Sequence, residues 1–141
     1  MKFWRESQDD IRKVNPDREL AQSILKMIEV RIKALDQLNR KEFASLVVEG
    51  YYEIIKENVT ALMAIDGYKT LSHEVLIGFL KEFYTQFSES EIIFADQLRQ
   101  LRNKIAYKGF FVQYDYIERN EARIKGVVSK LLDILREKLK K

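Results

Sequence analysis

The chain has 141 residues, of which 46% are hydrophobic and 33% charged, so its length and composition are those of one globular domain. It has no Cys and a single His, which excludes disulfides and zinc sites built from Cys and His. We expect neither a metal nor a cofactor. No apolar run is long enough to cross a bilayer, and the first residues, MKFWRESQDD, lack the apolar stretch of a signal peptide. We therefore expect a cytoplasmic protein that does not use a membrane.

The net charge of +3 is distributed unevenly along the chain. Residues 97–141 hold 12 Lys and Arg against 5 Asp and Glu, a net charge of +7, which leaves −4 on residues 1–96. A basic segment beside an acidic remainder indicates a surface that meets an anion, such as nucleic acid or an acidic partner. Cations near the C-terminus also offset a helix dipole, but Arg99, Arg102 and Lys104 lie too early in the chain for that role.

Apolar residues recur at helical spacing over most of the sequence, as in the run Leu20, Ile24, Ile28, Ile32 and Leu35. Capping signals divide the chain into five predicted helices. The first begins at Asn15-Pro16 and ends near Asn39, and the second runs from about Glu42 to Gly67. The third begins after Ser72, and the fourth begins after Ser88 or Ser90 and ends at Gly109. The fifth begins at Asp115–Glu118, which resembles a capping box. Short connections predict an all-α, antiparallel up-and-down bundle of about five helices, with residues 1–141 as one domain. Residues 1–14 are expected to add a short N-terminal helix or arm.

The fourth predicted helix carries two neighbouring stripes of side chains. One is apolar and faces the core: Phe94, Leu98, Leu101 and Ile105. The other alternates small and basic residues: Ala95, Arg99, Arg102 and Ala106. Small residues let a second helix approach closely, and each Arg can bind a phosphate or carboxylate with two parallel hydrogen bonds. The alternative is that both arginines pair with acids on a neighbouring helix.

The end of this helix, Arg102-Asn103-Lys104-Ile105-Ala106-Tyr107, resembles the Arg-(four to six residues)-His motif of HEPN domains from prokaryotic nucleotidyltransferase and toxin–antitoxin systems. Tyr107 stands in the place of the histidine. Other pieces of the sequence are similar to the family in their order: Tyr51-Tyr52, Ala61-Leu62, Gly67 and Ser72-His73. The resemblance runs from about Phe43 to Leu139. It implies a HEPN-like bundle, a homodimer and a nucleotidyltransferase partner.

The ribonuclease members of this family are understood to cleave RNA without a metal, in a cleft between two protomers. The resemblance implies the same kind of site for this chain if it is an enzyme. There the Arg steadies the scissile phosphate and the His moves a proton. The candidate catalytic residues here are Arg102, Asn103 and Tyr107. A tyrosine with a pKa near 10 is a poor general base at neutral pH, whereas a histidine with a pKa near 6.5 is a good one. We therefore predict no appreciable RNA cleavage. His73 is expected to be a surface or cap residue.

The predicted RNA- or nucleotide-binding residues are Arg99, Arg102, Asn103, Lys104, Tyr107 and Lys108. Several aromatic residues interleave with these cations, namely Tyr107, Phe110, Phe111, Tyr114 and Tyr116, which suits single-stranded nucleic acid, a partner interface or packing on the core. The carboxylates Glu49, Glu53 and Glu57 form a stripe that is expected to be a solvated face rather than a Mg²⁺ site.

Three functions stay open at this stage. The first, which is the leading hypothesis, is a HEPN-like binding module that contacts RNA or a nucleotide, or partners a nucleotidyltransferase. The second is a metal-independent ribonuclease of the toxin type. The third is a structural helical dimer that has no role with nucleic acid.

Overall fold

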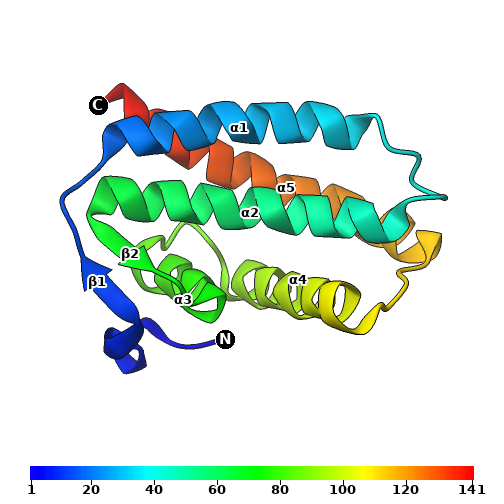
Figure 1. The fold of residues 1–141 in the computed structure, drawn as a ribbon, viewed down its shortest axis with the longest axis horizontal. Helices are drawn as coiled ribbons and strands as arrows, with labels where there is room; N and C mark the ends of the chain where they lie inside the picture. The colour runs from blue at the N-terminus through cyan, green and yellow to red at the C-terminus, as the bar shows by residue number, and fades with distance from the viewer.

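The computed structural model describes residues 1–141, and five helices account for most of them. They are α1 (Arg18–Asp36), α2 (Ala44–Asp66), α3 (His73–Phe83), α4 (Glu89–Lys108) and α5 (Tyr114–Lys140). Figure 1 shows α1, α2 and α5 side by side, with α3 and α4 along α2. The predicted helical class and the number of helices are therefore confirmed. None of the helices is both long and apolar enough to pass through a membrane.

Helix α2 lies at the centre and contacts the four other helices. More than half of its 23 residues are buried, and Ile54, Ile55 and Leu62 are fully inaccessible. A helix that is apolar around most of its circumference has to be surrounded by other elements. The core is therefore built around α2, and each neighbouring helix contributes one apolar face to it.

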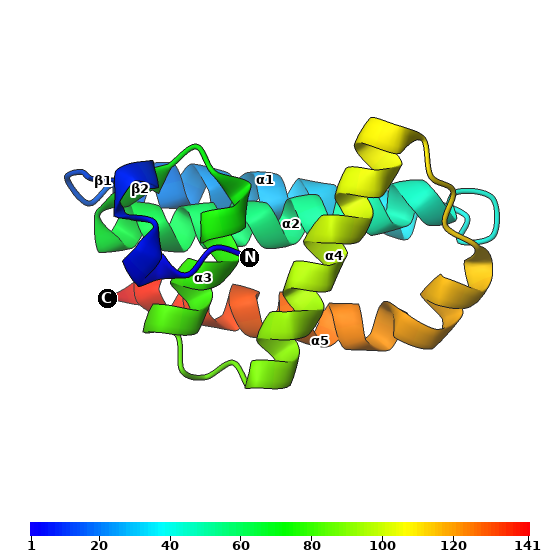
Figure 2. The same ribbon diagram turned by 90° about the horizontal axis from the view of Figure 1, so that it is seen from below.

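The direction of the chain alternates along the sequence (Figure 1). α1 runs one way, α2 returns, the segment with α3 and α4 leads back, and α5 returns again. α5 packs against α2 and runs parallel to it. Figure 2 shows α4 crossing the long helices at a steep angle. The expected antiparallel order thus holds between α1 and α2 but not between α2 and α5. The reason is that α3 and α4, which lead the chain back, lie on another side of α2, so that α5 can pack directly on α2.

Three helix ends follow the capping signals in the sequence. Gly67 and Gly109 end α2 and α4 with φ angles of 85° and 63°, a left-handed conformation that glycine adopts without strain. Ser88 caps α4 in a complete capping box with Glu91. Ser72 precedes α3 as predicted, although its side chain makes no capping hydrogen bond.

Two helix starts and one core residue differ from the prediction. The N-cap of α1 is Asp17, which accepts a hydrogen bond from the Leu20 amide at 2.9 Å, and not Asn15. Leu20 itself is exposed, because the face of α1 that packs on α2 is shifted toward Ala21. α5 starts at Tyr114, so Asp115 lies in its first turn instead of capping it.

Residues 1–14 form no α-helix. They make two short 3₁₀ turns and then β1 (Ile11–Lys13), which pairs antiparallel with β2 (Tyr68–Thr70). The buried Trp4 packs on the rings of Tyr68, Phe79 and Phe83, with centroid separations of 5.0 to 5.4 Å. Of the two expected forms, a short helix or an arm, the chain adopts the arm, because pairing with β2 satisfies its backbone and the aromatic cluster buries its tryptophan.

One polar cluster connects the α1–α2 loop to α2 and α5. Arg40 donates to the carbonyls of Leu35 and Leu38 at the end of α1, at 2.6 and 2.8 Å, and to Glu121 of α5 at 2.8 Å. The Tyr51 hydroxyl of α2 donates to the same Glu121 carboxylate. Burial alone would raise the pKa of Glu121, but the hydrogen bonds from Arg40 and Tyr51 hold it below its usual value. These contacts fix the end of the bundle at which α1, α2 and α5 meet.

We predict that Gly78→Ala destabilises the protein by about 1–3 kcal/mol, the usual cost of overpacking. A Cβ at this position of α3 would lie 2.1 Å from the Lys2 carbonyl oxygen, so the N-terminal arm would have to move. The matched control is Gly126→Ala in α5, where a Cβ meets nothing within 4 Å. That change should stabilise the helix by about 0.5–1 kcal/mol. Urea unfolding measures both changes, and equal effects of the two substitutions would contradict the packing of the arm on Gly78.

Candidate functional site

The candidate site lies at the C-terminal end of α4, where the chain crosses the end of α2. The capping box at Ser88 sets the start of the helix, and Gly109 ends it immediately after Lys108. The following loop returns to α2, since the Val112 amide donates to the Ser45 hydroxyl at 2.8 Å. Both ends of the segment are therefore fixed, and the side chains of residues 102–111 project from a rigid support.

Arg99 and Arg102 have different environments although they belong to the same predicted stripe. Arg99 is only 7% exposed, and its Nε donates to the Asp96 carboxylate at 2.9 Å. Asp96 also forms an ion pair with the amino group of Met1 at 3.4 Å. Burial works to raise the pKa of Asp96, but its hydrogen bond to Arg99 and the nearby positive charges lower it. Asp96 therefore joins α4 to the N-terminal arm, and Arg99, which is bound to Asp96 within the same helix, has no free face for a ligand.

Arg102 is half-buried and forms no ion pair with a carboxylate within 4.0 Å. Its Nη1 lies 3.4 Å from the Asn103 amide oxygen and 3.4 Å from the Tyr107 hydroxyl. The guanidinium carbon is 5.7 Å from the centre of the Tyr107 ring, a cation–π distance. The structure thus brings the three motif residues together and leaves the positive charge of Arg102 without a neutralising partner.

The other predicted binding residues surround this arrangement at the surface. Lys104 and Lys108 are exposed and form no ion pair, and the Tyr107 ring is largely exposed as well. Between Leu98 and Val112 the chain has four cations and no carboxylate. The end of α4 is therefore a region of unneutralised positive charge, which suits an anionic ligand.

Tyr52 of α2 and His73 of α3 also belong to this region, although the sequence did not indicate that they lie near Arg102. Tyr52 of α2 is 1% exposed, and its hydroxyl has no hydrogen-bond partner in the chain. Burial raises the pKa of Tyr52 to about 12, and the nearby charges of Arg99 and Arg102 act in the opposite direction. An unpartnered buried hydroxyl is uncommon, and here it lies beneath two arginines.

His73, the first residue of α3, is exposed and lies near the same charges. Partial loss of hydration lowers its pKa, and the positive charges of Lys56 and Arg102 lower it further. His73 is therefore neutral at pH 7. His73 lies near Arg102 because α3 packs beside α4. The sequence predicted only a surface or cap residue and could not predict this electrostatic interaction.

The acidic stripe on α2 is offset only in part, because one lysine faces Glu53 and Glu57 while Glu49 forms no ion pair. Lys56 lies 2.7 Å from Glu53 and 4.0 Å from Glu57. Burial works to raise the pKa of Glu53, but the hydrogen bond from Lys56 and the charges of Arg31 and Arg102 lower it. Glu53 is thus bound to Lys56 and is attracted to Arg102 without forming an ion pair with it within 4.0 Å.

The small-residue stripe on α4 is not available to a second copy of the chain. Ala95 is buried in the core of its own protomer, and only Ala106 is exposed. α4 buries this face because it packs on α2 and α3. Ala95 therefore does not offer a close approach to a second copy along α4, and the homodimer that the resemblance implies stays a prediction.

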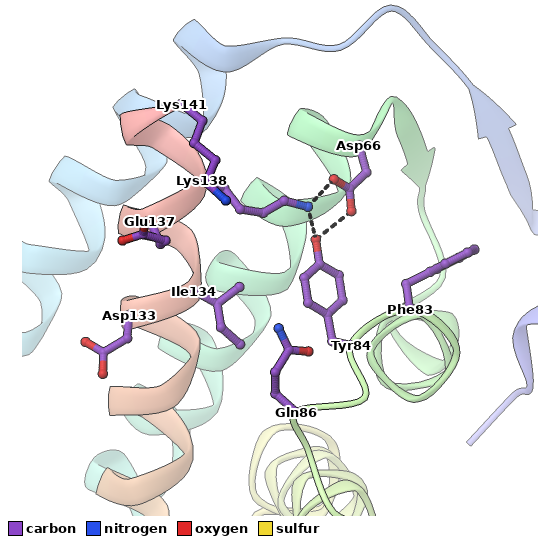
Figure 3. A pocket seen from close by; sticks show the side chains of 9 residues that line it. All are labelled: Asp66, Phe83, Tyr84, Gln86, Asp133, Ile134, Glu137, Lys138 and Lys141. Atoms are coloured by element: carbon purple, nitrogen blue, oxygen red, sulfur yellow. Dashed lines mark hydrogen bonds and ion pairs between the residues drawn. The ribbon is translucent and has the colours of Figure 1, made fainter.

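The largest cavity, about 710 Å³, lies between the ends of α2, α3 and α5. Figure 3 shows Lys138, Asp66 and Tyr84 pointing toward one another at its wall. The Lys138 ammonium donates to Asp66 and to the Tyr84 hydroxyl, and Tyr84 donates to Asp66. Burial and the contact with Asp66 raise the pKa of Tyr84. These three groups satisfy one another, so they connect α2, the end of α3 and α5.

No family model, curated protein or solved structure matches this chain. The assignment of a function consequently depends on the geometry of the α4 end and on the motif that it contains.

We predict opposite effects on stability from two adjacent substitutions in α2. Tyr51→Phe removes a hydrogen bond to the Glu121 carboxylate, so the free energy of unfolding should fall by about 1.5–3 kcal/mol. Tyr52→Phe removes a buried hydroxyl that has no partner, so stability should stay the same or rise by about 1 kcal/mol. Denaturant titration of both variants measures the difference. A clear loss of stability in Tyr52→Phe would show that its hydroxyl is hydrogen-bonded.

Proposed function

We propose that this protein is a HEPN-like binding module that contacts RNA or a nucleotide through the end of α4. The observation that carries the proposal is the state of Arg102, a half-buried guanidinium that has no carboxylate partner. Most buried or half-buried cations in this chain are paired, as Arg99 is with Asp96 and Arg40 with Glu121, and Arg31 is the one other half-buried cation without an ion pair. An unpaired Arg held in place by its neighbours is pre-organised for a phosphate, which it binds through two parallel hydrogen bonds.

The arrangement of the motif supports the HEPN-like part of the proposal. Arg102, Asn103 and Tyr107 are in contact at the end of a helix, as the resemblance implies for its Arg and His positions. The alternation of chain direction through the helices agrees with an up-and-down bundle. A homodimer and a nucleotidyltransferase partner are implied by the same resemblance and belong to the proposal.

We predict that Arg102→Ala weakens the binding of single-stranded RNA by about tenfold or more at about 50 mM salt. A hydrogen bond to a charged group contributes about 1.5–3 kcal/mol, and the loss of one phosphate contact also reduces the dependence on salt. The control is Lys140→Ala, which removes the same charge from an exposed residue at the end of α5. It should change the affinity by about twofold at most.

Titration of labelled RNA at two salt concentrations measures both effects, and thermal unfolding checks that each variant folds. Equal weakening by the two substitutions would mean that binding depends on net charge alone. Absence of binding by the wild type at about 50 mM salt would remove the nucleic-acid part of the proposal.

The ribonuclease alternative has one observation in its favour, the contact between Arg102 and Tyr107. We predict that the wild type does not cleave single-stranded RNA appreciably, because a positioned general base contributes about 10²–10⁴-fold and a tyrosine does not supply it. Tyr107→His restores an imidazole beside Arg102 and should raise cleavage in EDTA. The double variant Arg102→Ala/Tyr107→His is the control and should be inactive. Robust cleavage by the wild type that is lost in Arg102→Ala would favour the enzyme.

A further inference from the structure

Three aromatic side chains at the end of α4 are unusually exposed. Tyr107 is 74% exposed, Phe110 50% and Phe111 76%. In contrast, most aromatic residues elsewhere in the chain are buried or half-buried in the core. Three large rings within five residues form a concentrated apolar surface, which in a folded protein usually marks a binding site.

The backbone that carries these rings is fixed at both sides. Gly109 turns the chain with a φ of 63°, and the Phe110 amide donates to the Lys104 carbonyl at 3.2 Å. On the other side, Val112 is buried and its amide is bound to Ser45. The exposure of Phe110 and Phe111 therefore comes from a defined turn that directs both rings outward between two anchored residues.

A cavity of about 360 Å³ lies between this turn and the first turns of α2. Its apolar wall contains Leu46, Ile105, Phe110 and Phe111, and Glu42 and Glu49 provide most of its polar groups. Both carboxylates are free of ion pairs in the chain and can only accept hydrogen bonds when ionised. The volume falls within the range of about 300–1,000 Å³ that is common for small-ligand sites.

Three cations of α4 lie beside the cavity and outside its lining. Lys104 and Lys108 share one face of the helix, Arg102 lies on another face, and none of the three forms an ion pair. A single nucleic-acid strand offers phosphates to the cations and flat, unpaired bases to the rings, and its amino groups can donate to the carboxylates.

We propose that this cavity, which we call the aromatic slot, binds an unpaired nucleobase of single-stranded RNA. The phosphates of that strand lie along Arg102, Lys104 and Lys108, while the base stacks on Phe111 and Phe110. The inference rests on the proposed function and adds its substrate class. RNA duplexes are poor ligands, because their bases are stacked within the helix and cannot enter the slot.

The test uses an RNA of about 12 nucleotides of A and C, alone and annealed to its complement. Phe111→Ala should weaken binding of the single strand by about 5- to 100-fold, the usual range for loss of one stacked base. It should leave duplex binding and the salt dependence unchanged, because stacking neutralises no phosphate. Phe111→Trp preserves the platform and should retain the affinity of the wild type. The matched control is Phe3→Ala, an exposed ring on the N-terminal arm.

The outcomes separate this inference from the proposed function. If Phe111→Ala binds the single strand as the wild type does while Arg102→Ala does not, the slot is wrong and the phosphate contact stands. If neither form of RNA binds the wild type, both proposals fail. If light scattering gives the wild type about twice the 16.8 kDa chain mass and Phe111→Ala the mass of a single chain, the slot is an interface between protein chains and the inference is overturned.

Discussion

Helix α2 loses its contact with water on nearly every side, and this burial determines where the other helices lie. Its apolar residues face α1, α3, α4 and α5, so each of these helices is oriented by the surface that it presents to α2. The steep crossing of α4 seen in Figure 2 places the first half of that helix against α2 and α3, while its last turns extend toward solvent. The candidate site is the part of α4 that the core does not cover.

Ion pairs inside the bundle determine which charges remain unpaired at the surface, just as burial determines which helix faces remain exposed. Several partly buried carboxylates are bound to cations: Asp96 to Arg99 and to the amino group of Met1, Glu121 to Arg40, Glu53 to Lys56 and Asp66 to Lys138. The pairs Asp96–Met1, Glu121–Arg40 and Asp66–Lys138 join different elements, whereas Asp96–Arg99 lies within α4 and Glu53–Lys56 within α2. All are partly shielded from water, so their hydrogen bonds fix side-chain positions more than exposed pairs do. The acids in these pairs are therefore already used. Arg102, Lys104 and Lys108 form no ion pair, and neither do Glu42 and Glu49, which line the aromatic slot.

A rigid helix end and a short anchored turn bring two kinds of recognition together in a small area. The unpaired cations suit phosphates, and the exposed rings suit flat apolar groups. Neither feature benefits the isolated chain, since unneutralised charge and exposed aromatic surface both favour a partner that covers them. Their location beside one another, on a segment held by Gly109 and by the Val112–Ser45 hydrogen bond, makes the end of α4 the best candidate for function.

The sequence by itself determined the helical class, the five helices and several of their ends, because the apolar period, the Ser88 capping box and the glycines at positions 67 and 109 act over a few residues. Arg102, Asn103 and Tyr107 lie within six residues of one helix, so the contacts among them follow from local structure. Only the tertiary structure separated Arg99 from Arg102, since two arginines on one stripe differ only in what packs over them. It also decided that residues 11–13 pair with residues 68–70 and that Tyr52 and His73 lie near Arg102. These contacts join segments that are far apart in the chain. Burial and charge interactions stabilise them, and neither can be read from a local sequence pattern.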